Sequence, residues 1–534
     1  MRDRLVIGAA ILALTFLSYF QFPGHTYLAS DTQIYVPMLD HIWDPSALAR
    51  DLVAPKPHLS YTLYDEIAIA LRWVTRSSFQ AVLTAQQLLF RALQILGVYL
   101  LALAFPLARA KALVVAALFT LGATIAGPAV LTFEYEPVPR AFAVGLIFLA
   151  IGLAAQEHLM WADIAAALAF LYHPPTVWAF WMLYLWLTLR HRHYRDLWPL
   201  AAGILVLLVS SRFQAGAAEP QSFFTHVTPE LEKLQRMRAS YNWISTWPAQ
   251  LIWQYVLLWF LSLAAFWRVR PRAARVFLIG MPAIGILSVP LSYLLLDQLK
   301  WGLIPQFQPA RALLFVTAFA VILGAAAAIR AAEGNRWVES ALWFTLVLAV
   351  PTSVPLFSIS LRNFLQLLAL SIALCGALAL QRFRFAWALL TAVVIAPGFV
   401  LPYLAHVRNY PRPNLAGLQD LAQYARAQTP KAAVFLFGDA GSSPDPSIFR
   451  ALSQRAVYVD WKSGGQINFS ETLAREWWQR WQATNALHFD RAELPRLPAL
   501  GIDYLALSVS HRLTDRQPAY ENSQFVVYKI PQMW

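Results

Sequence analysis

The chain has 534 residues, of which 58% are hydrophobic and only 13% are charged. Soluble domains carry about 25% charged residues, so this composition excludes an ordinary soluble protein. Apolar stretches of roughly 18 to 22 residues recur along most of the length, and each can cross the ~30 Å apolar core of a bilayer. We therefore expect a polytopic α-helical membrane protein.

The formal net charge of +13 comes largely from arginines between the apolar stretches. This distribution indicates membrane topology and not nucleic-acid binding, because no motif of alternating basic and aromatic residues accompanies it. The sequence also has no glycine-rich phosphate loop and no Cys/His cluster of metal-ligand spacing. Its one cysteine, Cys375, excludes an intrachain disulfide and is expected to serve packing.

Apolar runs predict about thirteen transmembrane helices. We place them near residues 5–22, 82–105, 112–131, 141–156, 161–173, 174–189, 197–211, 248–267, 276–296, 311–329, 337–357, 362–380 and 385–404. A cytoplasmic N-terminus puts nearly all basic connections inside, as the positive-inside rule requires. The pair 161–189 either crosses twice or forms a re-entrant hairpin at its His-Pro-Pro break, and both options leave the remaining orientation unchanged.

We expect two domains. Residues 1–405 form the membrane domain, with a first outer loop at 23–80 and a second at 132–140. An odd number of spans places residues 406–534 outside the cytoplasm, where strand and helix patterns alternate as in a small, partly parallel α/β domain. The strands are expected at 433–438, 456–460, 503–510 and 525–530.

Within this tail, aromatic and basic residues need separate interpretations. The three tryptophans of "EWWQRW", Trp477, Trp478 and Trp481, fit the domain core or the membrane interface. The basic residues of the preceding segment are expected on the solvated surface: Arg450, Arg455 and Lys462.

Ionisable residues recur at the outer ends of the predicted spans, where desolvation is costly and function is the leading explanation. They are Asp31 after the first span, Glu134 and Glu136 in the second outer loop, Arg140, His173 and Arg311. Helix ends held by packed spans position side chains better than long loops do. Their common location on one membrane face predicts a site there.

Each of these groups also has an ordinary structural role open to it. Asp31 could cap a helix that begins near Thr32, which is worth about 1 kcal/mol. The two glutamates could lie in a solvated turn, the two arginines could reach lipid phosphates, and the histidine could be a core residue. Solvated surface is the favoured interpretation for Asp51, Asp65 and Glu66 in the first outer loop.

The sequence resembles the GT-C superfamily of polyprenyl-phosphate-dependent glycosyltransferases, as a divergent branch. Four segments carry the resemblance: "SDTQIYVPMLDHIWDPSALARD" after the first span, "FEYEPVPRAFAVGL", "YHPP" and "QFQPARALLFV". The order of long first outer loop, short second outer loop, many spans and outer C-terminal domain also matches. The resemblance implies transfer of a sugar from a polyprenyl-phosphate donor to an acceptor outside the membrane, with inversion.

The resemblance also implies roles for single residues. Asp31 would be the base or a metal ligand, and Glu134 or Glu136 would assist; a divalent ion, Mg²⁺ or Mn²⁺, would contact Asp31 and Glu136. Inverting transfer needs a carboxylate to take the acceptor proton and positive charge on the leaving phosphate. Arg140 and Arg311 are expected to bind that phosphate. His173 and Tyr35 are expected to contact the substrate.

The expected partners are the lipid bilayer, the polyprenyl-phosphate-linked sugar and an acceptor that could be a glycan, lipid or protein. One alternative is a noncatalytic GT-C-like scaffold or binder of lipid-linked saccharides. Another is a transporter or flippase, which would place charged residues along mid-span positions, where the predicted spans have few. The Ala-, Leu- and Arg-rich composition suggests a bacterial inner membrane.

Overall fold

The computed structural model describes residues 2–56, 62–191, 194–214, 225–383, 386–404, 406–407, 409–411, 415–485 and 494–531. By its internal contacts the chain divides into two compact units. Unit 1 comprises Met1–His25, Leu83–Val209 and Tyr241–Pro411. Unit 2 comprises Thr26–Val82, Ser210–Ser240 and Arg412–Trp534, so it combines the C-terminal segment with much of the predicted first outer loop.

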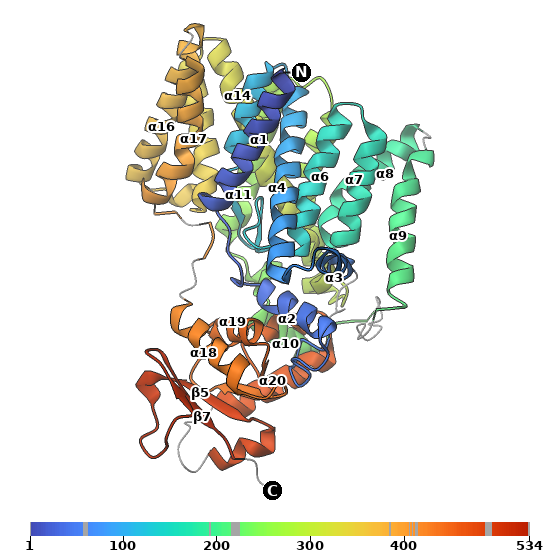
Figure 1. Ribbon diagram of the computed structural model, residues 1–534. Helices are drawn as coiled ribbons and strands as arrows, with labels where there is room; N and C mark the ends of the chain where they lie inside the picture. Colours follow the sequence, from blue (N-terminus) through green and yellow to red (C-terminus); the bar gives the residue numbers. More distant parts are fainter. Residues whose placement is uncertain are drawn as a thin grey trace. The chain divides into compact units, whose positions relative to one another are not determined.

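Unit 1 is built from helices that follow the predicted spans (Figure 1). They are α1 (Arg2–Phe20), α4 (Phe79–Leu103), α5 (Arg109–Phe119), α6 (Pro139–Ala155), α7 (Leu159–Tyr172), α8 (Pro174–His191), α9 (Trp198–Ser210), α11 (Ala249–Val269), α12 (Arg275–Ser292), α13 (Ile304–Phe307), α14 (Leu313–Glu333), α15 (Trp337–Ala349), α16 (Leu361–Ala379) and α17 (Ala386–Leu404). Within the described ranges, seven helical segments are long and apolar enough to cross a membrane, and three shorter helices are also apolar. The prediction of a polytopic helical membrane protein is confirmed.

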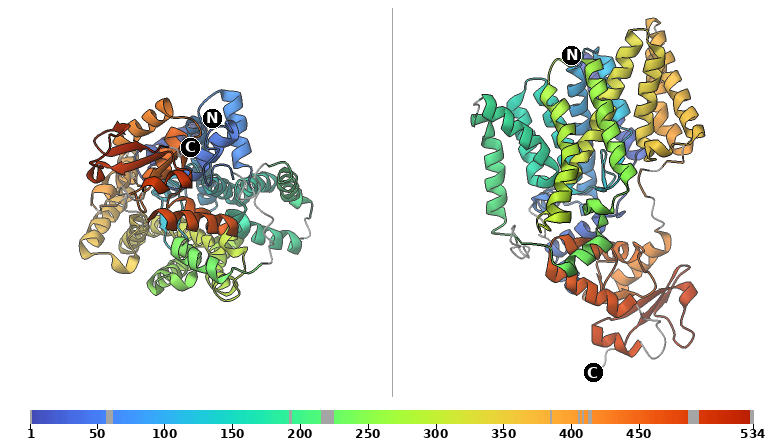
Figure 2. Two further views of the ribbon diagram at one scale, coloured as in Figure 1. Left: turned by 90° about the horizontal axis from the view of Figure 1, so that it is seen from below. Right: turned by 180° about the vertical axis from the view of Figure 1, so that it is seen from behind.

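Helix α14 forms the centre of unit 1. It is apolar on all sides, and its most apolar stretch is entirely buried, as expected of a helix surrounded by others. It packs against α5, α11, α12 and α15, which are part of the helical bundle seen in Figures 1 and 2. This packing fixes the N-terminal end of α14, where Arg311 precedes the helix.

The predicted third span, 112–131, is wrong. Helix α5 ends at Phe119, and the chain then forms an antiparallel hairpin of β1 (Thr124–Ile125) and β2 (Val130–Leu131). Gly122 and Gly127 adopt φ of +71° and +85°, left-handed values that a helix cannot include. The apolar run therefore divides into a short helix and a buried hairpin that leads into the second outer loop.

The break at residues 173–175 joins two separate helices, α7 and α8. Only His173 lies between them, and Pro174 begins α8 at the position where a missing N–H costs no helical hydrogen bond. The two helices contact one another, and α7 also packs extensively on α6. His173 is therefore held at the junction of packed helices.

Unit 2 contains one mixed sheet with the strand order β4-β3-β5-β7-β6. Its strands are β3 (Val434–Phe437), β4 (Ala456–Val457), β5 (Tyr504–Ser508), β6 (Tyr520–Glu521) and β7 (Phe525–Lys529). The first three strands of this order pair in parallel and the last two join antiparallel. Its helices are α2 (Thr32–Trp43), α3 (Tyr64–Thr75), α10 (Pro229–Arg238), α18 (Ala416–Gln428), α19 (Asp445–Ser453) and α20 (Glu471–Asn485). The predicted partly parallel α/β domain is confirmed.

One apolar core holds the segments of unit 2 together. It joins Ile34 and Met38 of α2 to Trp477 of α20 and Leu505 of β5. Trp477 is fully buried, and its indole N–H donates to the Asp460 carbonyl at 2.9 Å. The core interpretation therefore holds for this tryptophan, and the early segment containing α2 is part of the same core.

The surface assignments for Arg450 and Asp51 are wrong. Both side chains are fully buried, with Arg450 Nη1 at 2.8 Å from Asp460 Oδ2 and 3.6 Å from Asp51 Oδ1. Asp51 also accepts backbone N–H groups of Val53 and Ala54, each at 3.0 Å. These charges are buried because they neutralise each other and saturate nearby backbone donors.

Two further surface assignments also fail. Arg455 is buried and donates to the carbonyls of Arg426 and Thr429, both at 2.9 Å. Asp65 is buried at the first turn of α3, and burial followed by the neighbouring charge of Glu66 raises its pKa well above its usual value. Long-range packing, which no local pattern encodes, accounts for both errors.

Candidate functional site

The second outer loop contains a buried ion pair between Glu134 and Arg140. Arg140 Nε lies 2.7 Å from Glu134 Oε1, and Nη2 lies 3.3 Å from Oε2. The Glu134 side chain is 1% exposed and the Arg140 side chain is 12% exposed. The Leu131 N–H also donates to Glu134 Oε1 at 3.2 Å, so the carboxylate links β2 to the start of α6. This two-point contact fixes the orientation of the guanidinium.

Arg91 of α4 holds the backbone of this loop. Its guanidinium donates to the carbonyls of Ser18, Gly24 and Glu134 at 2.6, 2.8 and 2.9 Å. Gln94, one turn further along α4, donates to the Thr132 carbonyl at 2.6 Å. Arg91 is not among the predicted site residues, although a charged residue inside a predicted span is a strong functional or structural signal.

Arg311 and the ion pair line the same small pocket. Arg311 belongs to the 3₁₀ turn Pro309–Ala312 that leads into α14, whose burial fixes its position. Apolar side chains and one threonine complete the lining: Val130, Val144, Thr176, Leu314 and Phe315. The pocket therefore combines two guanidinium groups with a single carboxylate, in largely apolar surroundings.

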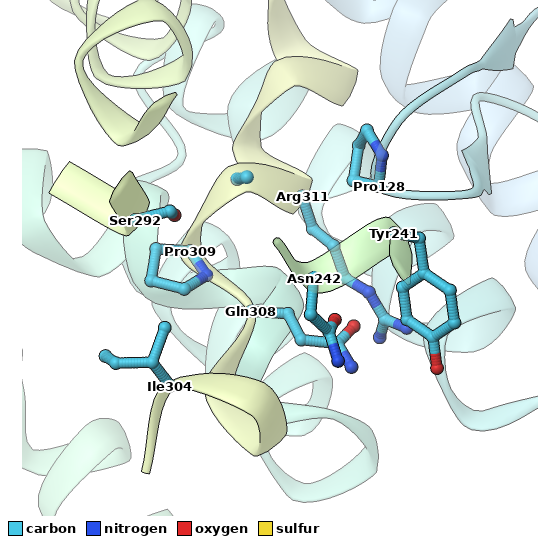
Figure 3. Close-up of a pocket in the computed structure, with 9 residues that line it drawn as sticks. Pro128, Tyr241, Asn242, Ser292, Ile304, Gln308, Pro309 and Arg311 are labelled. Atoms are coloured by element: carbon cyan, nitrogen blue, oxygen red, sulfur yellow. The ribbon is translucent and has the colours of Figure 1, made fainter. Parts of the chain in front are cut away.

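Arg311 also lines a second pocket on the other side of its turn. Polar side chains from several segments gather there: Tyr241, Asn242, Ser292 and Gln308. Figure 3 shows the Arg311 guanidinium beside the side chains of Asn242 and Tyr241, with Gln308 close by. Sequence reasoning did not single out these neutral polar residues. The turn thus presents one cation to two adjoining pockets of different polarity.

His173 lies next to the first pocket but does not belong to its lining. Its Nδ1 lies 2.7 Å from the Thr176 hydroxyl, and Thr176 lines the pocket. Glu136 is fully buried and is likewise outside that lining. Of the residues predicted in unit 1, the structure therefore brings together Glu134, Arg140 and Arg311, with His173 one hydrogen bond away.

Asp31 belongs to unit 2 and precedes α2. It occupies the N-cap position with helical backbone angles, and its side chain makes no capping hydrogen bond to α2. The carboxylate instead accepts from Lys462 Nζ at 2.6 Å, and the same ammonium contacts the Ser30 hydroxyl at 2.8 Å. The Asp31 side chain therefore does not stabilise α2 by capping it. Lys462, predicted on the solvated surface, instead forms an ion pair with Asp31.

Tyr35 also belongs to unit 2. Its ring lies 5.4 Å from that of Tyr64 and packs against the apolar core of this unit. This packing gives Tyr35 a structural role, whereas its predicted substrate contact stays a prediction.

A divalent metal has no preformed site in the part of the chain that the structure describes. No three His, Cys, Asp or Glu side chains gather closely enough there to hold one. Asp31 is paired with an ammonium group, an unfavourable neighbour for a second cation. Asp31 and Glu136 belong to different units, so the metal contact predicted for this pair stays a prediction.

Comparison with known proteins gives matches of two kinds. A family described as "Domain of unknown function (DUF6798)" matches residues 416–484, from α18 to α20 in unit 2. No curated protein matches the chain. Crystal structures of ArnT from Cupriavidus metallidurans, one bound to undecaprenyl phosphate and one in the apo state, are similar in fold. Each has 14% identity and a TM-score of 0.48, with 98% of this chain and 97% of the other covered.

Proposed function

We propose that this protein is a membrane glycosyltransferase that takes a sugar from a polyprenyl-phosphate donor. One observation carries the proposal: Arg140 and Arg311 line one apolar-walled pocket in which Glu134 is the only carboxylate of the lining. The lining thus combines two cations and one carboxylate with mostly apolar side chains, a setting that suits an anion carried on an apolar chain. A phosphate on an apolar chain meets both requirements of this pocket.

The proposed reaction uses this positive charge at the leaving group. When the bond between the sugar and the phosphate breaks, negative charge develops on the departing polyprenyl phosphate. Arginine matches phosphate oxygens with several donors, and its effect is strongest where water is excluded. Arg311 is assigned to that phosphate directly, together with Arg140. Glu134 is assigned as a positioning residue, because its carboxylate contacts Arg140 at two points.

Asp31 is assigned as the base that takes the proton from the acceptor hydroxyl, on the sequence resemblance alone. A carboxylate in this role must approach the hydroxyl to hydrogen-bond distance. Lys462 at 2.6 Å holds the Asp31 carboxylate in a defined position. We place the reaction at the extracytoplasmic side of a bacterial inner membrane, with the N-terminus in the cytoplasm.

The test of the proposed function measures transfer by the full chain in lipid nanodiscs. A labelled polyprenyl-phosphate-linked sugar serves as donor, and a membrane extract supplies acceptors. Replacement of Arg311 by Gln is expected to lower the transfer rate by about 10²- to 10³-fold, since one transition-state donor is lost. The matched control is Arg336→Gln, an exposed arginine of unit 1 whose partner is Glu339. Transfer by Arg311→Gln at the wild-type rate would refute the phosphate assignment.

A second variant separates catalysis from binding. Asp31→Asn is expected to abolish transfer while binding of undecaprenyl phosphate, measured by native mass spectrometry, stays unchanged. Wild-type transfer by this variant would remove Asp31 from the mechanism. If the wild-type chain binds the lipid phosphate and transfers no sugar, the noncatalytic binder becomes the better description.

A further inference from the structure

Residues at the ends of α2 and α3 line an open pocket in unit 2; Figure 1 labels these two helices. Its lining consists of two arginines, two tryptophans, a valine and the serine pair that follows α3. These are Arg72, Arg76, Trp43, Trp73, Val74, Ser77 and Ser78. The lining therefore holds two positive charges and no carboxylate, beside a large aromatic surface.

Arg72 is held in place by two aromatic rings. The carbon of its guanidinium lies 4.5 Å from the ring centre of Trp43 and 4.2 Å from that of Phe79. The buried carboxylate of Asp40 is 3.8 Å from Arg72 Nη1. Stacking between aromatic faces restricts the guanidinium, so less conformational entropy is lost when it binds an anion.

Arg76 ends α3 in the left-handed conformation, with φ of +55°, and its N–H donates to the Arg72 carbonyl. This backbone bond places the two arginines one helical turn apart, beside the two serines. Both positive charges consequently belong to one lining and can contact one anionic group together.

The same segment exposes apolar side chains. Trp73 is 73% exposed and Val74 is 70% exposed. Exposed aromatic and aliphatic residues next to arginines are typical of helices that lie in the interface of a bilayer, where tryptophan sits at headgroup level. The apolar helix α4, which is long enough to cross a membrane, begins at Phe79 directly after this segment.

We propose that this pocket binds the headgroup of an anionic bilayer phospholipid. Arg72 and Arg76 contact the phosphate, and Trp73 and Val74 contact the apolar part of the lipid beside it. Charge complementarity selects this occupant, since the lining has two cations and only one carboxylate, Asp40, lies beside them. The inference rests on the membrane character of the chain and is independent of the proposed glycosyltransferase activity.

The test uses the purified full chain in nanodiscs that contain a photoactivatable phosphatidylglycerol, with phosphatidylcholine as the neutral counterpart. Crosslinked peptides are mapped by mass spectrometry. Crosslinking is expected at residues 70–78, with phosphatidylglycerol favoured about tenfold or more over phosphatidylcholine. The double variant Arg72→Gln/Arg76→Gln is expected to lose this preference, whereas Trp73→Ala lowers crosslinking of both lipids.

The matched control is Arg475→Gln/Arg512→Gln, which removes two exposed arginines of the same unit outside the pocket. It is expected to leave crosslinking unchanged, and hydrogen exchange of the β5 amides verifies that each variant folds. Equal crosslinking of both lipids, or an unchanged preference in the double variant, would overturn the proposal. Displacement of phosphatidylglycerol by equimolar undecaprenyl phosphate or by inorganic phosphate would also overturn it, because the site would then belong to a donor lipid or a soluble anion.

Discussion

The two units place arginine in opposite electrostatic settings. In unit 2, fully buried Arg450 contacts two carboxylates, Asp460 and Asp51, and Ser463 Oγ accepts a further hydrogen bond at 2.8 Å. In unit 1, Arg140 and Arg311 line a pocket with one carboxylate. Unit 2 places one cation between two carboxylates. The pocket lining of unit 1 has two cations and one carboxylate.

This difference separates a structural charge from a charge that is available to a ligand. Burial lowers the pKa of the Arg450 guanidinium, but Asp460 and Asp51 outweigh it and raise the pKa overall, so their mutual attraction dominates. By contrast, one carboxylate accompanies two cations in the pocket lining of unit 1. We therefore expect the charge balance around an arginine to indicate its role. Four substitutions test this rule.

The largest effect is expected for Arg450→Gln. Removal of the cation leaves Asp51 and Asp460 buried beside each other, which costs about 3–5 kcal/mol of the free energy of unfolding of unit 2. Hydrogen exchange at the β3 and β5 amides measures the loss. The exposed Arg475→Gln serves as control and should change exchange little. Unchanged exchange in Arg450→Gln would show that this network contributes no net stability.

The next effect concerns Asp40, whose partner Arg72 is shared with two aromatic rings. Burial raises the pKa of Asp40 from 3.8 to about 6, although a hydrogen bond from Gln454 and the charge of Arg72 oppose the shift. The folded state thus holds a proton that the unfolded chain releases between about pH 4 and pH 6. Stability of unit 2 should fall as pH rises through this window, by about 3 kcal/mol in total.

The variant Asp40→Asn should lose this dependence and be more stable above pH 6. Hydrogen exchange of the α2 amides at pH 4.5 and pH 7 measures the difference. Identical pH dependence in the variant and the wild-type chain would show that Asp40 does not titrate in this window. It would also show that the Asp40 carboxylate is already charged at pH 4.5 in the folded chain.

A third effect is expected in binding and not in stability. Arg311→Gln should weaken binding of undecaprenyl phosphate by about tenfold to a hundredfold, the range for one lost charged hydrogen bond. The melting temperature of the chain should stay within about 2 °C, because the Arg311 side chain is only partly buried. A melting temperature lowered as far as in Arg450→Gln would place Arg311 among the structural arginines.

The smallest effect is expected at an exposed pair. Arg50 lies 2.9 Å from Asp503 and is 44% exposed. Exposed pairs of this kind contribute about 0–1 kcal/mol, so Arg50→Gln should alter hydrogen exchange of β5 within that limit. A loss of several kcal/mol would show that this ion pair stabilises unit 2 despite its exposure.

The sequence was sufficient to predict the fold class, because apolar length and strand patterns are local signals. The hairpin after α5 was missed, since its apolar residues continue the run and only Gly122 and Gly127 mark the interruption. The segment that contains α2 was predicted as part of the first outer loop, separate from the C-terminal domain. Its packing with α20 depends on contacts between residues more than 400 positions apart, which no local pattern records.

The candidate site was predictable in part for the same reason. Glu134 and Arg140 are close in sequence and each lies at the end of an expected span. Arg311 shared that position, so its grouping with them followed from topology. The Asp51–Arg450 pairing could not be predicted, because 399 positions separate these residues and each is hydrophilic by type. The pairing of Asp31 with Lys462 has the same origin.

The three bonds of Arg91 have a consequence for the order in which the protein assembles. They join the end of α1, the segment after it and the second outer loop through one side chain on α4. The ribosome delivers these segments in the order α1, α4 and then the loop. A guanidinium placed in the bilayer with α4 can already bind the carbonyls beside α1, while its third acceptor at Glu134 has yet to emerge. We therefore expect α1 and α4 to pack together before the second outer loop folds against them.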